Sequence, residues 1–440
     1  MSFVNYEYNT LIEKISGKLN RRSGYKFILA FVFSILCILF GIWGIYSTLT
    51  QGLTVWGINQ QVTWGIAIVN FVFWIGIGHA GTLISAILYL LNQKWRWSLH
   101  RSAEAMTIIA VIVAAMFPVI HTGRPWLNYW LFPYPSQMSL WGNFKSPLMW
   151  DVFAILTYLI VSVIFWYVGL IPDLSILKSR IKSKRLSEIY FFFSLGWKGL
   201  KKQWQAHNAL YRILAGIATP LVISVHSIVS FDFSAALLPG WHSTIFPPYF
   251  VAGAIFSGCA MVIIIMVIAR ELLDLKDFIS AVQLENISKI MLTFSLLIGY
   301  VYLTEIFFAF YSQNKWEAMQ IHHRIAGGFA LPFLTVIILN FIIPQMLWFK
   351  KVRGNIIFLI LISVCVCAGM WLERYIIVIS SLSFDYLKTT FSDYIPSLTD
   401  ISLTIGSFGL FSVFFLIFVR FIPVVSIFEL HNLNSGKSMK

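Results

Sequence analysis

The stretch SPLMWDVFAILTYLIVSVIFWYVGL, residues 146–170, decides the fold class. From Leu148 to Leu170 it holds one charged residue, Asp151, and is otherwise mostly apolar. A run of about 20 apolar residues is the length that an α-helix needs to cross the hydrocarbon core of a bilayer. The stretch therefore predicts a membrane-spanning helix. A carboxylate inside such a helix is unfavourable unless it is paired or hydrated, which marks Asp151 as a candidate functional residue.

The composition of the whole chain agrees with a membrane protein. Of its 440 residues, 58% are hydrophobic and only 11% are charged, whereas a soluble domain has roughly 25% charged residues. The mean hydropathy is +0.79. Repeated apolar runs predict an all-α integral membrane protein with ten transmembrane helices. We place the spans at residues 25–49, 62–91, 102–121, 147–171, 208–231, 245–270, 286–311, 325–349, 355–380 and 398–423.

The four cysteines give no sign of a disulfide or a metal site. Cys37, Cys259, Cys365 and Cys367 all lie in apolar runs, and no two of them form a C-x-x-C motif. Buried cysteines of this kind behave as small apolar side chains. We therefore expect no metal and no covalent cofactor in this chain, so that any iron–sulfur cluster that accepts electrons from it must belong to a partner.

Basic residues alternate between successive loops, which fixes the orientation. The loops predicted to be cytoplasmic hold most of them: Lys14, Lys18, Arg21, Arg22, Lys26, Lys94, Arg96, Arg101, Lys178, Arg180, Lys182, Lys184, Arg185, Lys198, Lys201, Lys202, Arg270, Lys276, Lys289, Lys350, Lys351 and Arg353. The outward loops hold only Arg124, Lys145, Lys315, Arg324 and Lys388. The positive-inside rule then puts both termini in the cytoplasm. The net charge of +14 is explained by these loops, and we exclude nucleic-acid binding.

We divide the chain into four regions on this basis. Residues 1–24 form a cytoplasmic N-terminal segment, and residues 25–231 form a first membrane half that contains the first span and a four-helix bundle of spans two to five. Residues 232–423 form a second half with a bundle of spans six to nine and the last span. Residues 424–440 form a cytoplasmic tail.

Ionisable residues gather in the outer half of the predicted membrane region. They are His121 in HTGRPW (121–126), Asp151, His226 and Asp232 in ISVHSIVSFDF (223–233), Glu305, and Glu373 with Arg374 in GMWLERY (369–375). His79 lies nearer the middle. Ordinary structural roles also fit some of them: Arg124 as a counter-ion of Asp151 or Asp232, Arg374 as an ion pair with Glu373 or Glu305, and His79 as a donor to a backbone carbonyl. Glu104 and Asp173 are expected to be surface groups at the inner boundary.

Oxidation of a quinol suits this set of residues. A quinol loses two electrons and two protons, and its ring and tail need an apolar site that opens to the lipid. A histidine or carboxylate that titrates near neutral pH can accept a hydroxyl proton as an electron leaves. We expect His121, Asp151 and Asp232 to be catalytic, because they lie at one depth. Arg124, His226, Arg374 and His79 are the other ionisable candidates for a quinone-binding or supporting role. Glu305 and Glu373 are candidates for a proton path.

The loop at residues 122–146 is rich in aromatic residues. Trp126, Tyr129, Trp130, Phe132, Tyr134, Trp141 and Phe144 lie between prolines. Amphipathic rings settle at the level of the lipid headgroups, so an aromatic belt is one interpretation. A docking surface over a site on the outer face is the other, and the two are compatible.

A series of motifs resembles the NrfD/polysulfide reductase membrane subunits. They are GHAGTLISAILYLLNQKWR (78–96), HTGRPW, NFKSPLMWDVFAILTY (143–158), FWYVGLIPDL (165–174), SVHSIVSFDF (224–233) and GMWLERY. Within this family the chain most resembles the larger, quinone-binding membrane subunits of bacterial alternative complex III. The resemblance runs from about residue 51 to residue 423, and the motifs keep their order.

The resemblance implies two four-helix bundles flanked by a first and a last helix. It implies a quinol site near the periplasmic face with His121, Asp151, Asp232 and Arg374 as site residues and with His226 and Arg124 close by. It also implies a respiratory quinol oxidoreductase that passes electrons to an iron–sulfur subunit, with a multihaem cytochrome c and other membrane subunits as partners and with proton translocation as a further activity. We expect menaquinone rather than ubiquinone as the quinone, although the residues themselves leave that choice open.

Two other functions are compatible with parts of the pattern. His121 and His226 lie at similar predicted depths and could ligate a haem, as in a di-haem cytochrome b. No second pair of histidines is evident across the membrane. The outer charges could also form the ion site of a secondary transporter, although such sites tend to lie at the bilayer midplane on broken helices.

Overall fold

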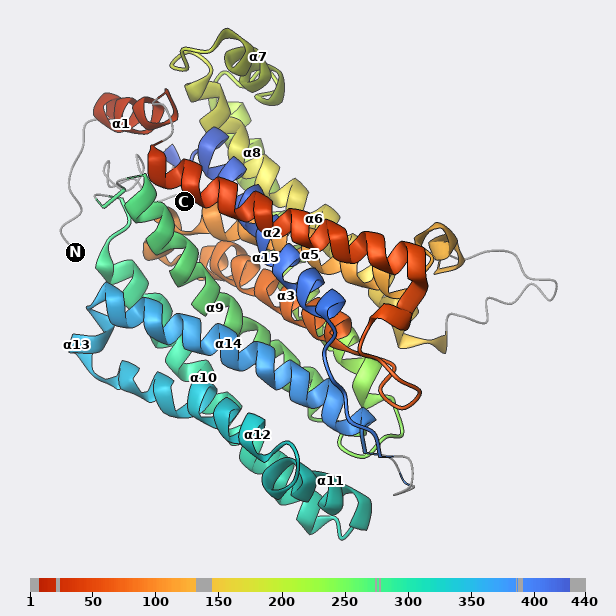
Figure 1. The fold of residues 1–440 in the computed structure, drawn as a ribbon. Coiled ribbons are helices and arrows are strands. Elements are labelled where there is room, and N and C mark those ends of the chain that lie inside the picture. Colours follow the sequence, from red (N-terminus) through yellow and green to blue (C-terminus); the bar gives the residue numbers. More distant parts are fainter. Residues whose placement is uncertain are drawn as a thin grey trace.

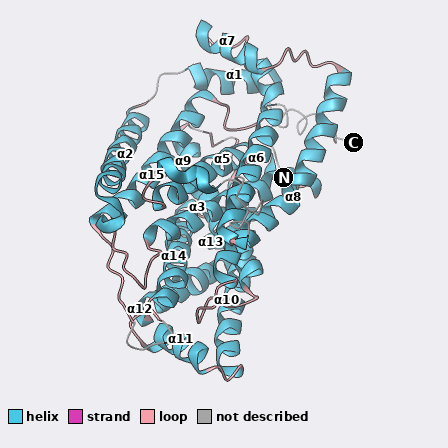
Figure 2. Cartoon of the chain, turned by 90° about the vertical axis from the view of Figure 1, so that its right-hand side faces the viewer, coloured by secondary structure: helices cyan, strands magenta, loops and turns pink. Residues whose placement is uncertain are grey.

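The computed structural model describes residues 8–20, 24–131, 145–273, 275–276, 278–384, 386 and 391–427. Within these residues all regular elements are helical, and ten helices are long and apolar enough to cross a membrane (Figures 1 and 2). The predicted fold class and number of spans are confirmed. The spans are α2 (Tyr25–Gln51), α3 (Ile66–Thr82) with η2 (Leu83–Ile87) and α4 (Leu88–Leu90), α5 (His100–His121), α6 (Pro147–Leu177), α8 (Lys201–Ser234), α9 (Phe246–Leu272), α10 (Ala281–Tyr311), α12 (Ala330–Ile337) with η6 (Ile338–Ile342) and η7 (Ile343–Trp348), α14 (Ile356–Leu382) and α15 (Leu398–Phe421).

Short helices cap the two ends of the bundle. The end that we call the basic face carries α1 (Tyr8–Asn20), η3 (Lys94–Ser98), α7 (Lys184–Phe193) and α13 (Lys350–Arg353). The opposite face carries η1 (Gly52–Val55), η4 (Pro125–Leu131) and α11 (Lys315–Ala326). In Figure 1, α1 and α7 lie at one end of the long helices and α11 lies at the other. The spans α6, α8 and α10 extend toward the basic face beyond their apolar runs, because polar residues continue a helix at headgroup depth.

The helix α3 is the centre of the fold. All 17 of its residues from Ile66 to Thr82 are buried, and it packs against α5 and α9. A helix that is apolar around most of its circumference suits either a protein core or lipid, and its complete burial shows that α3 is enclosed by other helices. The helix α2 is the opposite case: 17% of its most apolar window is buried, because lipid covers most of its surface.

The first and last spans pack closely against each other along faces of small residues. A Cβ atom added to Gly41 of α2 would lie 2.6 Å from the Cα of Gly406 in α15, and one added to Gly409 would lie 2.7 Å from the Cβ of Cys37. Small residues let two backbones approach in a bilayer, where helices associate by packing rather than by exclusion of water. Figure 2 shows α2 and α15 together at one edge of the bundle.

The eighth span begins later than the predicted residue 325. The polar segment EAMQIHHRIA (residues 317–326) is part of a separate short helix, α11, which ends at Ala326, and the span starts at Ala330. A buried arginine, Arg324, anchors α11 at this end of the bundle, as described below. The short helix therefore covers the second half of the chain at the opposite face.

The expectation that Glu104 and Asp173 are surface groups is wrong. Arg101 lies between them: its Nη2 atom is 3.0 Å from Oδ2 of Asp173 and its Nη1 atom is 3.8 Å from Oε2 of Glu104. The exposed fractions of the three residues are 4% or less. The Tyr211 hydroxyl donates to Glu104 at 2.9 Å. A buried charged cluster at the basic face therefore joins α5, α6 and α8.

The two membrane halves share one core. The helix α9 packs against α3 and α8 of the first half and against α10 and α14 of the second. In Figure 1, α9 runs between the two groups of helices. The proposed boundary at residues 231–232 falls at the end of α8 and stays a prediction, as do the terminal segments 1–24 and 424–440, most of the second of which lies outside the described residues.

The orientation can be tested by labelling from each side. Single cysteines at Gln137, which lies outside the described residues, and at Ser183, which caps α7, should react with a membrane-impermeant maleimide from opposite sides of the membrane. The basic loops predict that Ser183→Cys reacts only in inside-out vesicles. The chain with its four natural cysteines replaced by alanine is the control. Reaction of both cysteines from one side would contradict the ten-span topology.

Candidate functional site

Two carboxylic acids face each other between α6 and α8, near the opposite face. Asp151 lies in the first turns of α6 and is 4% exposed, and Asp232 lies in the last turn of α8 and is half-buried. The two carboxyl groups are neighbours, close enough to interact electrostatically. A hydrogen bond between them needs a proton on one, since an ionised carboxylate only accepts. The pair can therefore hold a proton between its two members.

The pair lacks other donors. Among the described residues, no N–H or O–H group donates to either oxygen of Asp151 or to Oδ1 of Asp232. Buried polar atoms nearly always have a partner, so atoms without one point to a ligand, an ordered water or a proton. Burial of one residue and partial exposure of the other put the pair at the edge of an apolar region.

His121 ends α5 at the same face, and no hydrogen bond between it and the pair is found among the described residues. Its ring packs against Trp56, with the ring centroids 5.7 Å apart. Its Nδ1 atom is buried and has no hydrogen-bond partner among the described residues. The next helical segment begins four residues later at Pro125, because the chain turns at Gly123 with a φ of +68°. His121 therefore occupies a partly exposed position against an aromatic wall.

Arg124 makes no ion pair with the carboxyl pair in the part of the chain that the structure describes. Its side chain is exposed, and within the described part of the chain it forms no ion pair. The expected meeting of His121, Arg124 and Asp151 is therefore absent from the contacts that the structure describes. Arg124 is available to a molecule that covers this face.

His79 and His226 meet in the interior, between α3 and α8. Their ring centroids are 4.5 Å apart, and the ring of Tyr158 stacks on His79 at 5.2 Å. The Nδ1 atom of His79 lies 2.5 Å from the Ile75 carbonyl, so this nitrogen carries the proton. Neither ring nitrogen of His226 has a partner among the described residues. The donor role considered for His79 is confirmed, but the adjacent histidine gives it a second neighbour.

Arg374 and Glu373 continue the polar region into the second half of the chain. The ring of Phe250 lies between them and the histidines, with its centroid 5.8 Å from that of His226 and 4.2 Å from the guanidinium carbon of Arg374. The Nη1 atom of Arg374 is 3.4 Å from Oε1 of Glu373. The Arg374–Glu373 pair that the sequence left open is therefore present.

Glu373 also accepts hydrogen bonds from two neutral groups. The Tyr302 hydroxyl donates to its Oε2 atom, and the Asn340 amide nitrogen is 3.3 Å from the same atom. Asn340 also donates to the Tyr302 hydroxyl at 3.0 Å. All of these groups are buried between α10, η6 and α14. A row of polar and aromatic side chains therefore runs from His79 to Asn340 across both halves.

Glu305 forms its ion pair with Arg324, and Arg374 is not its partner. The Nη1 atom of Arg324 is 2.6 Å from Oε1 of Glu305. Arg324 is 1% exposed and also donates to the hydroxyls of Ser380 and Ser381. Nearby, the Gly240 amide donates to Glu317 at 2.9 Å, while burial raises the pKa of Glu317. This cluster ties α11 to α10 and α14.

The structure thus resolves the predicted residues into separate groups. Asp151 and Asp232 form the first group. The second group extends from His79 and His226 to Arg374 and Glu373. Glu305 pairs with Arg324, while His121 and Arg124 belong to neither group. The sequence did not single out Arg324 or Asn340. Arg324 was counted as an outward loop residue, and its place at the end of an amphipathic helix was the missed signal. Asn340 carries no charge, so a search for ionisable groups passes over it.

The aromatic loop is only partly described. Trp126 and Tyr129 in η4 are 62% and 57% exposed, while residues 132–144, with four of the seven aromatic residues, lie outside the described part. Large exposed rings at the end of a membrane bundle are typical of the headgroup level or of a protein interface. Both interpretations of the loop remain predictions.

Comparison with known proteins gives consistent matches. A family model described as "Polysulphide reductase, NrfD" matches residues 54–384. A selenate reductase subunit from Mesobacillus selenatarsenatis is 22% identical over 389 residues, which cover 84% of this chain and 88% of that protein. A "Putative dimethyl sulfoxide reductase membrane subunit" from Halobacterium salinarum is 24% identical over 222 residues, or 50% of this chain. The matched region covers 47% of the Halobacterium salinarum protein, so this chain spans about half of the length of that protein.

Proposed function

Because the chain belongs to the polysulphide reductase NrfD family, we propose that it is the quinol-binding membrane subunit of a respiratory complex. It would oxidise quinol near the outer face of a bacterial inner membrane and pass the electrons to a partner iron–sulfur subunit. We propose that the complex is of the alternative complex III type. Its quinol would be menaquinol, and proton translocation would be a further activity. Its relatives named as subunits of selenate and dimethyl sulfoxide reductases support a role as one subunit of a redox complex.

One observation carries this function: the facing carboxyl groups of Asp151 and Asp232 accept no other hydrogen bond among the described residues. A quinol offers two O–H donors, which are the groups that buried acceptors without donors need. Quinol oxidation supplies two electrons and two protons, and the carboxyl pair lies where it can take a proton.

The histidines and Arg374 have supporting roles in this proposal. His79 is fixed in one tautomer by the Ile75 carbonyl, and its ring orients His226 by direct contact. His226 then offers a nitrogen to a ligand or to a proton. Arg374, at 4.2 Å from the ring of Phe250, keeps a positive charge in the interior that favours nearby negative charge.

We assign Glu373 and Glu305 to a proton path through the second half. Both carboxylates are in the half of the membrane region nearer the opposite face, and each has a basic partner that compensates its charge when it is ionised. Tyr302 and Asn340 give Glu373 two hydrogen-bonding neighbours through which a proton can be held. Proton movement between two such groups needs water or side-chain motion, since no hydrogen bond between them is found among the described residues.

The partner would cover the opposite face. The exposed Trp126 and Tyr129 of η4 and the exposed Arg124 follow His121 directly in the chain. Interfaces are enriched in tryptophan, tyrosine and arginine, so this patch suits a protein that brings an acceptor close to the quinol site. We propose an iron–sulfur subunit there, with a multihaem cytochrome c beyond it.

Retention of quinone by the purified full chain tests the site. About one quinone per chain is expected after extraction in mild detergent, and Asp151→Ala with Asp232→Ala should lower it several-fold, because the acceptor of one quinol hydroxyl is lost. The control is Glu188→Gln, which changes an exposed carboxylate on α7 at the basic face. Equal quinone contents in the double variant and the wild type would exclude the carboxyl pair as the binding site.

We expect His121→Gln to remove one limb of the pH–rate profile. Glutamine keeps a hydrogen-bonding group beside Trp56 but cannot carry a proton. A histidine that accepts a proton during turnover must be neutral beforehand, so its protonation at low pH gives the profile an acid-side limb. The measurement is the rate of quinol oxidation by the purified complex from pH 5 to pH 9.

The same variant should retain bound quinone in part, which separates proton transfer from binding. The control is His207→Gln, a histidine of α8 near the basic face. A wild-type pH profile in His121→Gln would remove His121 from the proton path and leave Asp151 or Asp232 as the acceptor.

A further inference from the structure

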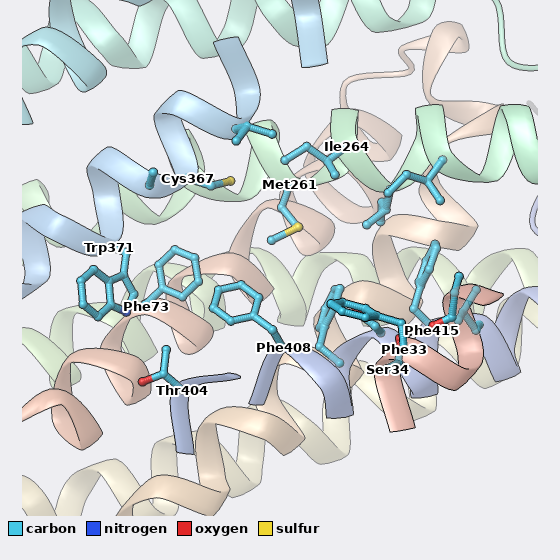
Figure 3. A pocket seen from close by; sticks show the side chains of 18 of the residues that line it. Phe33, Ser34, Phe73, Met261, Ile264, Cys367, Trp371, Thr404, Phe408 and Phe415 are labelled. Carbon is cyan, nitrogen blue, oxygen red and sulfur yellow. Dashed lines mark hydrogen bonds between the residues drawn. The ribbon is translucent and has the colours of Figure 1, made fainter. Parts of the chain in front are cut away.

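A large apolar cavity lies on the side of the bundle away from the carboxyl pair. It has a volume of about 720 Å³ and is lined by residues of α2, α9, α14 and α15, with Phe73 of α3 at its base. Figure 3 shows Trp371 and Thr404 at one end, Met261 and Cys367 along one wall, and Phe33 with Phe415 toward the other end. We call this cavity the lateral groove.

The lateral groove runs from mid-membrane to the basic face and opens to the lipid. Its lining includes Trp371, in the middle of α14, and Leu272, the last residue of α9. Several lining residues are well exposed, among them Phe33 at 68% and Val364 at 49%. Asn70, the buried amide at the end of the groove farther from the basic face, donates to Thr404 and accepts from Trp371, so the groove presents no unpartnered amide there. The apolar lining of the groove therefore suits a hydrocarbon chain as its ligand.

A second cavity continues the groove at the basic face. It has a volume of about 260 Å³, and Leu272 lines both cavities. Two other helices also line both cavities. In α2, Ala30 lines the groove and Phe27, one turn away, lines the second cavity. In α15, Leu416 lines the groove and Val419 lines the second cavity. Residues three or four apart lie on the same face of a helix, so the two cavities form one continuous path. We call the second cavity the basic mouth.

Positive charge surrounds the basic mouth. Lys18 of α1 and Arg420 of α15 line it, and the exposed Lys26 starts α2 close by. Arg420 also donates to the Leu19 carbonyl at 2.7 Å, which fixes its guanidinium at the rim. Of the nearby acids, Glu271 is engaged by Arg270 and Lys276 at 3.3 Å each, Glu13 is exposed on α1, and Asp274 and Asp277 lie outside the described residues. Lys18 also lies 5.7 Å from the centroid of the Phe278 ring. The described lining of the mouth therefore includes two basic side chains and no acidic one.

We infer that the lateral groove and the basic mouth together bind one anionic phospholipid from the leaflet that meets the basic face. An acyl chain lies in the groove, and the phosphate of the headgroup lies between Lys18 and Arg420. This site is separate from the carboxyl pair, which is near the opposite face, and it does not depend on quinol oxidation.

The headgroup decides which lipid is retained. A groove that is open to a bilayer fills with some hydrocarbon chain, because an empty groove loses dispersion contacts on its walls. Exclusion of water cannot favour one chain over another, since the bilayer is as apolar as the groove. A basic residue near the membrane surface contributes about 1 kcal/mol of attraction to anionic lipid, which corresponds to about a five-fold change in affinity. The basic mouth therefore determines which phospholipid headgroup is preferred, and the lateral groove provides the binding site for an acyl chain.

Lipid competition on the purified full chain tests this site. The delipidated chain is incubated with equal amounts of phosphatidylglycerol and phosphatidylcholine of identical acyl chains, and the retained lipid is measured by native mass spectrometry. Wild type should retain phosphatidylglycerol at least several-fold over phosphatidylcholine. Lys18→Gln should weaken that preference about five-fold, as expected for one basic residue. The control Lys201→Gln removes an exposed charge of the same face that does not line the mouth and should leave the preference unchanged.

A second variant tests the groove itself. Ala368→Phe places a ring in the cavity, and it should lower the retention of both lipids, whereas Leu361→Phe on an exposed part of the same helix outside the cavity should not. Ala30→Phe on α2 repeats the test if Ala368→Phe does not fold. Equal retention of the two lipids by the wild type, or unchanged retention in both groove variants, would overturn the site. Recovery of a quinone in place of phospholipid, lost on Ala368→Phe, would assign the groove to a quinone tail and would overturn it as well.

Discussion

Replacement of Asp151 by asparagine is expected to lower quinol oxidation by about 10²–10⁴-fold, the usual effect of losing a general base. Asparagine has nearly the same shape but cannot hold the proton that two facing carboxyl groups share. Asp151 is buried and has no other donor among the described residues, so the change removes a negative charge without breaking an ion pair that the structure describes. The measurement is steady-state quinol oxidation by the purified complex.

The controls separate chemistry from folding. Asp151→Asn should assemble and elute like the wild type, because a neutral amide is easier to bury than a carboxylate. Asp232→Asn should also be impaired, and the double variant should lose little more than the worse single one, since two residues that act as a unit are not additive. Glu188→Gln on α7 should retain full activity. Normal turnover of Asp151→Asn would assign Asp151 to structure alone.

Replacement of Arg324 by methionine is expected to destabilise the protein by about 3–5 kcal/mol, as found when one partner of a buried ion pair is removed. Glu305 would keep its charge but lose the guanidinium at 2.6 Å, and Ser380 and Ser381 would lose their donor. The helix α11 should then detach from α14. The measurement is thermal unfolding in detergent, followed by reaction of the buried Cys259 with a thiol dye in a background without the three other cysteines.

Two further variants make this test specific. Arg324→Met combined with Glu305→Leu removes both charges, and it should recover much of the lost stability, because no uncompensated charge remains buried. Lys289→Met breaks an exposed pair with Glu285 at 3.4 Å and should change stability by less than about 1 kcal/mol. An Arg324→Met variant as stable as Lys289→Met would show that Arg324 does not anchor α11.

The spans could be predicted from the sequence, because the length of an apolar run is itself the physical constraint that a bilayer imposes. All ten runs correspond to helices, and the largest departures occur where a helix continues into polar residues, as in α8 from Lys201. The separation of α11 from the eighth span was harder to predict. Its polar residues bury Gln320 and Arg324 against α14, a tertiary contact that no local pattern of hydropathy encodes.

The individual site residues were found by one rule, that an ionisable group inside a span needs a reason to be there. Their partners could not be found in this way. Depth along the membrane normal follows from sequence position, but the direction in which a side chain points around its helix depends on packing. His121 and Asp151 lie near the same face, yet His121 packs on Trp56 and Asp151 faces Asp232. Glu104 and Asp173 were misassigned for the same reason, since Arg101 covers both.

The close packing of α2 against α15 has a consequence for synthesis. About 350 residues separate the end of α2 at Gln51 from the start of α15 at Leu398, and at about 5–20 residues per second the ribosome needs roughly 20–70 seconds to make them. During that time Gly41 and Cys37 of α2 face lipid or a membrane chaperone, because their partners Gly406 and Gly409 do not yet exist. A nascent chain stalled before the last span would display this bare glycine face, by which membrane proteases could recognise an unfinished protein.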